Sequence, residues 1–162
     1  MIVLGIDPGT ARLGFGVLRK DGPRLTHLVH GCLETPKTMS QPDRLHRLSR
    51  ELEALLAFHQ PDLIGVERLF FAKNAKTAMT VSEARGMILV AAKNHRLEIL
   101  EHTPMQVKQA VAGYGGADKR QVQEMVCRLL KLKEIPKPDD AADALAIAYC
   151  AAVSHQPSYE TK

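Results

Sequence analysis

Two apolar runs of strand length that each end on a carboxylate constrain this fold more than any other feature of the chain. Residues 2–6 read Ile-Val-Leu-Gly-Ile and are followed by Asp7, and residues 63–66 read Leu-Ile-Gly-Val and are followed by Glu67. Continuous apolar runs of this length are typical of central strands that are covered on both faces of a sheet. Since ligands and catalytic groups collect at the carboxyl ends of such strands, both acids are candidates for a functional site.

The order of the remaining segments predicts a mixed α/β fold and not a strict alternation of strands and helices. Apolar periodicity, turn signals and capping residues define the expected elements. The expected strands cover residues 2–7, 13–19, 25–33, 62–67 and 97–100, and the expected helices begin near Ser40, Asn74, Thr103, Asp118 and Asp139. The second helix should end at His95 and the last at Ala152. We expect a single domain over residues 1–153 and a disordered tail over residues 154–162.

Composition excludes several classes of protein. The 162 residues contain no apolar run near the roughly 18 residues that a membrane-spanning helix needs. The start of the chain lacks the basic leader of a secretory signal, so we expect a cytoplasmic protein without membrane partners. Three cysteines, Cys32, Cys127 and Cys150, are scattered without metal-binding spacing, and we expect them to be reduced and unpaired.

The charge of the chain is modest in total and uneven along the sequence. There are 22 Lys and Arg against 18 Asp and Glu, an excess that permits a polyanionic partner without requiring one. Residues 68–120 alone hold nine basic and four acidic residues. This basic middle segment makes nucleic acid a candidate ligand, and a solvated surface is the alternative.

Two further acids, Asp140 and Asp143, stand three positions apart near the start of the last helix and therefore project from one face. Asp143 interrupts an apolar run over residues 141–148, and a buried charge there needs a partner. Asp7 can instead start a turn before Pro-Gly, and Asp140 can instead stabilise the helix N-terminus. Those alternatives apply to Asp7 and Asp140, whereas Glu67 and Asp143 end or interrupt apolar runs and still need a positive partner.

Four carboxylates on three segments, with no cluster of Cys or His, are hard oxygen ligands of the kind that Mg²⁺ and Mn²⁺ prefer. Two such ions about 3.5 to 4 Å apart can activate a water and stabilise the leaving oxygen in phosphodiester hydrolysis. A basic surface beside such a site would bind the phosphates of the substrate.

Five motifs in register from residue 1 to about residue 153 resemble the RuvC family of Holliday junction resolvases. The motifs are Gly5-Ile6-Asp7-Pro8-Gly9-Thr10, Gly65-Val66-Glu67 followed by Phe70 and Ala72-Lys73-Asn74-Ala75, Ala84-Arg85-Gly86, Pro104-Met105-Gln106-Val107-Lys108, and Asp140-Ala141-Ala142-Asp143-Ala144-Leu145-Ala146. One Asp-Pro-Gly motif alone would be weak, whereas five in order are specific.

The resemblance implies a ribonuclease-H-like α/β fold, a five-stranded mixed sheet flanked by helices on both faces. It implies a homodimer formed through the helix of residues 74–95, which nicks two strands of like polarity symmetrically on a four-way DNA junction. It also implies cooperation with a branch-migration motor complex of the RuvA and RuvB type. The metal-binding catalytic acids would be Asp7, Glu67, Asp140 and Asp143, with two Mg²⁺ or Mn²⁺ ions; some relatives have His where this chain has Asp140.

The resemblance further places Lys108 and Lys119 near the scissile phosphate and makes Phe70 an aromatic that stacks on a base at the junction centre. A solvated helix surface is the alternative for the lysines, and core packing is the alternative for Phe70. We also predict DNA contacts from other basic residues of the middle segment. These are Arg68, Lys73, Lys76 and Arg120.

Three rival functions compete with this interpretation. The loop Asp7-Pro8-Gly9-Thr10, with Gly14, resembles a phosphate loop of the actin and sugar-kinase phosphotransferases, but those enzymes close two related domains on ATP and this chain has one. A DNA-binding module with structural carboxylates does not explain four acids in family positions. A related nuclease of the same fold could act on another nucleic acid, against which the basic and aromatic positions around Phe70 argue.

Overall fold

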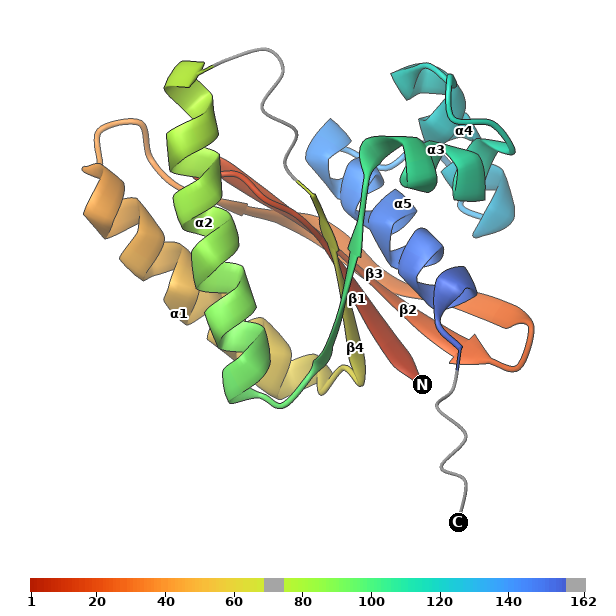
Figure 1. The fold of residues 1–162 in the computed structure, drawn as a ribbon, viewed down its shortest axis with the longest axis horizontal. Helices are drawn as coiled ribbons and strands as arrows, with labels where there is room; N and C mark the ends of the chain where they lie inside the picture. Colours follow the sequence, from red (N-terminus) through yellow and green to blue (C-terminus); the bar gives the residue numbers. More distant parts are fainter. Residues whose placement is uncertain (69–74, 157–162) are drawn as a thin grey trace.

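The five strands form one mixed sheet in the order β3-β2-β1-β4-β5 (Figure 1). The computed structural model describes residues 1–68 and 75–156, with the backbone alone for residues 75–77. The strands are β1 (Ile2–Asp7), β2 (Arg12–Asp21), β3 (Arg24–Glu34), β4 (Leu63–Glu67) and β5 (Glu98–His102). β1 pairs antiparallel with β2, and β2 antiparallel with β3, whereas β4 runs parallel to both β1 and β5. The predicted mixed order is confirmed.

Five helices in the described part of the chain cover both faces of the sheet (Figure 1). They are α1 (Gln41–His59), α2 (Ala75–Asn94), α3 (Pro104–Ala112), α4 (Lys119–Leu129) and α5 (Asp139–Ser154). α1 and α2 lie on one face, and α5 lies on the other with α3 and α4 outside it. The sheet therefore has a separate apolar core on each face.

Local sequence signals start three of these helices as predicted. Ser40 accepts a hydrogen bond from the backbone N–H of Asp43 at the start of α1. Thr103 forms a capping box with Gln106 at the start of α3, and Asp118 forms one with Gln121 at the start of α4. These caps fix the helices that carry Lys108 and Lys119.

Three predicted boundaries are wrong by two residues. β2 reaches Asp21 instead of ending at residue 19, because Asp21 still pairs with Arg24. β5 reaches His102 instead of ending at residue 100, because Glu101 and His102 pair in register with Val66 and Glu67 although both side chains are polar. α5 runs two residues past Ala152, so Ser154, which was predicted in the tail, belongs to the helix. Its hydroxyl donates to the carbonyl oxygen of Cys150 at 2.7 Å. Residues 157–162 lie outside the described residues, and their disorder stays a prediction.

Glycines on β1 and β2 let α5 lie directly on the sheet. A Cβ atom at Gly5 would collide with the carbonyl oxygen of Ala144, and one at Gly14 with the carbonyl oxygen of Asp140. Only residues without a side chain allow backbones to approach so closely. This contact brings the acidic start of α5 against the carboxyl end of β1.

The three cysteines are free, as predicted, with Cys150 buried and Cys32 and Cys127 half-buried. In the part of the chain that the structure describes, none of the helices combines the length and the apolarity that a bilayer crossing requires.

Candidate active site

A cavity of about 200 Å³ lies where the carboxyl ends of β1 and β4 meet α3, α4 and α5. Five of the residues predicted from the sequence line it, together with apolar side chains such as Val107 and Val122. The predicted residues are Asp7, Glu67, Lys108, Lys119 and Asp143. Residues that are up to 136 positions apart in the sequence are thus gathered by the fold into one site.

Strand pairing explains why the first two acids meet. β1 and β4 are parallel neighbours with Ile6 opposite Val66. The next residues, Asp7 and Glu67, therefore end their strands side by side at the same edge of the sheet. Asp7 also lies opposite Gly14 of β2, the glycine on which the start of α5 rests. The same edge therefore receives Asp140 and Asp143 from the first turns of α5.

The electrostatic coupling of these acids shows how close they lie. Burial, and then the charges of Asp143, Glu67 and Asp140 in that order, together raise the pKa of Asp7 to about 8, while Lys119 opposes the rise. Burial and then Asp143 raise the pKa of Glu67, while Lys108 and Lys119 oppose the rise. Each carboxylate thus disfavours the ionised form of its neighbours, which indicates a site with more negative charge than its own surroundings neutralise.

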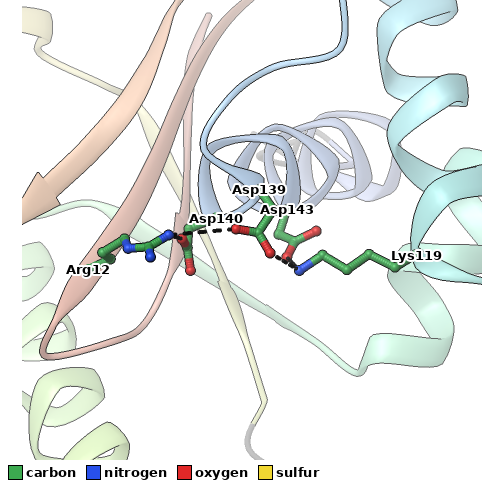
Figure 2. A network of polar contacts seen from close by, with 5 residues as sticks. All are labelled: Arg12, Lys119, Asp139, Asp140 and Asp143. Atoms are coloured by element: carbon green, nitrogen blue, oxygen red, sulfur yellow. Dashed lines mark hydrogen bonds and ion pairs between the residues drawn. The ribbon is translucent and has the colours of Figure 1, made fainter.

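Lys119 neutralises part of this charge from the side of α4. Its Nζ lies 2.6 Å from Oδ2 of Asp139 and 2.9 Å from Oδ2 of Asp143 (Figure 2). Burial lowers the pKa of Lys119, but the hydrogen bonds to Asp139 and Asp143 outweigh burial, so its pKa is raised and the ammonium stays charged. Burial raises the pKa of Asp143, and the same lysine limits the rise.

Arg12 neutralises the acids from the opposite side. Its Nη1 donates to Oδ2 of Asp140 at 3.1 Å and lies 3.8 Å from Oδ1 of Asp139 (Figure 2). Sequence reasoning missed Arg12 and treated Asp139 only as a helix-start residue. The available signal was the position of Arg12 directly after the Asp7 turn, at the start of a strand that pairs with β1.

The donor set fits a hard divalent cation, and two basic residues already bind some of its oxygens. Among residues 1–68 and 75–156, no three His, Cys, Asp or Glu side chains already converge on a common point as metal ligands would. Lys119 and Arg12 each bind carboxylate oxygens that a metal ion would need. Clustered oxygen donors with raised pKa values on Asp7, Glu67 and Asp143 are nevertheless suited to Mg²⁺ or Mn²⁺.

The other predicted DNA contacts lie away from the cavity lining or outside the described residues. Arg68 is mostly exposed, and its Nε lies 4.0 Å from Oε2 of Glu101. Arg120 is 82% exposed and donates to Glu124 one helical turn along α4. Phe70 and Lys73 lie outside the described residues, as does the side chain of Lys76, so their roles stay predictions.

A second polar cluster, which sequence reasoning did not predict, joins α2 to the edge of the site. Arg85 of α2 forms an ion pair with Glu101 of β5, the residue that also approaches Arg68. The motif around Arg85 contributed to the family resemblance, but no pattern indicated its partner. The cluster connects α2 to the residue that directly follows Glu67.

Comparison with known proteins identifies the family. Residues 3–151 match the family described as crossover junction endodeoxyribonuclease RuvC. This chain belongs to the RuvC family. A crossover junction endodeoxyribonuclease RuvC from Rubrobacter xylanophilus is 52% identical over 160 residues, which cover 99% of this chain and 89% of that protein.

Solved structures agree with this assignment. The Thermus thermophilus RuvC in complex with a Holliday junction substrate superposes with a TM-score of 0.86 at 38% identity, covering 93% of this chain and 92% of that one. The yeast mitochondrial Holliday junction resolvase Ydc2 has a TM-score of 0.68 at 18% identity over 93% of this chain and 77% of that one, which shows a shared fold. The predicted ribonuclease-H-like fold is confirmed, and this RuvC-family chain is a nuclease.

Proposed function

We propose that this RuvC-family chain resolves four-way DNA junctions in homologous recombination and repair by nicking two strands of like polarity symmetrically. The observation that carries the proposal is the single cavity in which the fold gathers three carboxylates and two lysines from β1, β4, α3, α4 and α5. Carboxylates suit a metal-assisted attack on a phosphodiester, and lysines suit the phosphate itself. The RuvC relatives supply the class of substrate.

Asp7, Glu67, Asp140 and Asp143 would hold Mg²⁺ or Mn²⁺, two ions per site. Such ions supply an activated water and a stabilised leaving oxygen when bound. Asp7 would be the ligand whose charge most needs the metal, because burial and three neighbouring acids raise its pKa. We therefore expect the metal affinity of the site to depend most strongly on Asp7.

The basic residues bind and orient the scissile strand. Lys108 and Lys119 line the same cavity as Asp7 and Glu67, so a phosphate bound there lies within reach of both ammonium groups. Lys119 has a raised pKa and stays protonated throughout the working range, which suits the stabilisation of charge that develops on the phosphate. Phe70 would stack on a base at the opened junction centre, and further phosphate contacts would come from Arg68, Lys73, Lys76 and Arg120.

A homodimer formed through α2 would present two such sites to one junction. Met79 and Val90 on this helix are 70% and 62% exposed, which is unusual for apolar side chains on a helix that packs against a sheet. They stand eleven positions apart, about three helical turns, and so share one face of α2. The two-fold axis of such a dimer would match the two-fold symmetry of a four-way junction.

Cleavage of a synthetic four-way junction tests the proposal. With Mg²⁺ or Mn²⁺ the protein should convert the junction into nicked duplexes that a ligase can seal, because symmetric cuts leave abutting ends. A linear duplex of the same sequence should stay intact. Asp7→Asn should abolish cutting and keep junction binding, and Asp21→Asn, an exposed acid at the end of β2, is the matched control.

Equal cutting of the linear duplex would contradict junction resolution. The protein would then be a nuclease without specificity for junctions. Preferential cutting of an RNA strand would favour the related nuclease that acts on another nucleic acid. Family membership supports neither that alternative nor the phosphotransferase. A cytoplasmic location and cooperation with a motor complex of the RuvA and RuvB type stay predictions from the sequence.

A further inference from the structure

Arg12 occupies a position that the proposed nuclease function does not yet explain. Its guanidinium pairs with Asp140, one of the four acids that would hold metal, and reaches toward Asp139 beside it. Figure 2 shows Arg12 and Lys119 approaching the acids at the start of α5 from opposite sides, one from β2 and the other from α4. A cation that holds a metal-binding carboxylate competes with the metal for it.

The ion pair between Arg12 and Asp140 is suited to being exchanged. The side chain of Arg12 is 50% exposed and that of Asp140 is 29% exposed, and one Nη1 makes the single hydrogen bond between them. Exposed pairs of this kind contribute about 0.2 to 1 kcal/mol. Carboxylate oxygens bind a divalent cation more strongly than that, and a guanidinium beside such a cation is repelled by it.

The backbone of Arg12 stays in place when the side chain moves. Arg12 pairs with Glu34 in the β2–β3 ladder, and the neighbouring Ala11 accepts a hydrogen bond from the N–H of Thr35 at 3.1 Å. A released guanidinium is therefore confined to the rim of the active site. There it can donate two parallel hydrogen bonds to a phosphate, which a lysine at the same position could not do.

We propose that Arg12 is a metal-gated DNA-binding residue: it holds Asp140 in the metal-free protein and transfers to a backbone phosphate of the substrate when Asp140 takes a divalent cation. The inference rests on the proposed nuclease function and adds a substrate contact that sequence reasoning did not include. It predicts opposite effects of Arg12 on metal binding and on DNA binding. It also predicts that the DNA contact exists only in the presence of metal.

The first measurement is Mn²⁺ binding to the protein without DNA, by titration calorimetry. Arg12→Gln should bind Mn²⁺ roughly two- to fivefold more tightly than the wild type, the fold-change equivalent to loss of a competing exposed ion pair. Arg47→Gln is the matched control, because Arg47 on α1 is 45% exposed and pairs with Glu51 through a single contact of 2.8 Å. It should leave Mn²⁺ binding unchanged.

The second measurement is the salt dependence of junction binding, made once with Ca²⁺ and once with EDTA. Denaturing gels verify that the DNA strands stay intact. Loss of one phosphate contact lowers the slope of log affinity against log salt concentration by about 0.9. Arg12→Gln should show that decrease with Ca²⁺ and none with EDTA. Arg12→Lys should recover the slope but not the full affinity, because it keeps the charge and loses the paired hydrogen bonds.

Unchanged or weaker Mn²⁺ binding by Arg12→Gln would overturn the competition between Arg12 and the metal. An equal decrease in slope with Ca²⁺ and with EDTA would overturn the gating. No decrease in either slope would overturn the DNA contact and would mean that the released side chain turns to an acid such as Glu34. If Arg12→Gln does not fold, the Mn²⁺ titration and both slopes are measured on Arg12→Ala, which also removes the charge. A wild type that does not bind junctions would refute the proposed function, and the Mn²⁺ result would still stand.

Discussion

α5 and α2 are both rich in apolar residues, yet the molecule uses them in opposite ways. α5 buries ten of its side chains against the sheet and the helices around it, and only its first turns present acids to the active site. α2 buries Ala84, Ile88, Ala91 and Ala92 but leaves Met79 and Val90 exposed. The apolar surface of α5 stabilises the single chain, whereas the exposed apolar surface of α2 is where we propose that a second copy binds.

The largest expected effect comes from separating α5 from the sheet. Gly5→Ala should lower the free energy of unfolding by about 3 kcal/mol or more, at the upper end for inserted core atoms, because the new methyl group meets backbone atoms of Ala144 and Ala148. Urea unfolding followed by circular dichroism measures this change. A loss below about 0.5 kcal/mol would mean that α5 does not rest on Gly5.

Next in size is the pH dependence that α5 imposes on Asp7. The pKa of Asp7 is about 8 in the folded protein against an ordinary value of 3.8, so the folded protein keeps a proton that the unfolded chain releases. The stability that this retained proton gives the folded state is fully present below pH 3.8 and is lost as pH rises to about 8. The loss is at most about 1.4 kcal/mol per pH unit. Metal-free protein should therefore become less stable over this range.

Asp7→Asn removes that titration, so its stability advantage over the metal-free wild type should grow with pH and level off above about 8. We expect an advantage of a few kcal/mol at pH 8, within the upper limit of roughly 6 kcal/mol that this slope sets over the range. Thermal unfolding in EDTA at several pH values measures it, with Asp21→Asn as the exposed control. An advantage that is equal at pH 5 and pH 8 would contradict a buried, repelled carboxylate. Added Mg²⁺ should shrink the advantage. The wild type keeps the Asp7 carboxylate, so metal binding stabilises it more than the variant.

The third prediction concerns the exposed face of α2. Met79→Glu should weaken dimerisation at least tenfold, because it removes apolar contact and places a charge where the second copy would exclude water. Met105→Glu is the control, since Met105 is 67% exposed but lies on α3. Sedimentation equilibrium measures both. If Met79→Glu dimerises like the wild type, α2 is not the interface.

The sequence could predict the elements and four of the acids because those features are local. A strand that ends on an acid, a capping box and two acids at helical spacing are readable without knowledge of the fold. Arg12 was missed because its partner Asp140 is 128 positions away, and nothing in the sequence pairs them. The ends of β5 were missed because pairing with Val66 and Glu67, and not the polarity of Glu101 and His102, extends that strand.

The same reasoning explains why the close approach of α5 could not be predicted. Gly5, Gly14 and Gly16 occur in strands, where glycine usually weakens a strand, and the sequence alone does not show what lies above them. The structure shows backbone and side chains of α5 in the space that their side chains would fill. What the sequence lacks is the distance between elements, and that distance decides which acids repel one another.

The smallest expected effect tests α2 in the same way that Gly5→Ala tests α5. Gly86 lies between Met79 and Val90 on the exposed face of α2, and a Cβ atom there meets nothing within 4 Å in the single chain. Gly86→Ala should therefore stabilise the monomer by up to about 1 kcal/mol through helix propensity, as measured by urea unfolding at high dilution.

If two copies of α2 approach closely at Gly86, the same methyl group should weaken dimerisation in sedimentation equilibrium. A variant that gains monomer stability and dimerises as tightly as the wild type would place the contact between copies elsewhere on α2. Loss of monomer stability would contradict the open surroundings of Gly86.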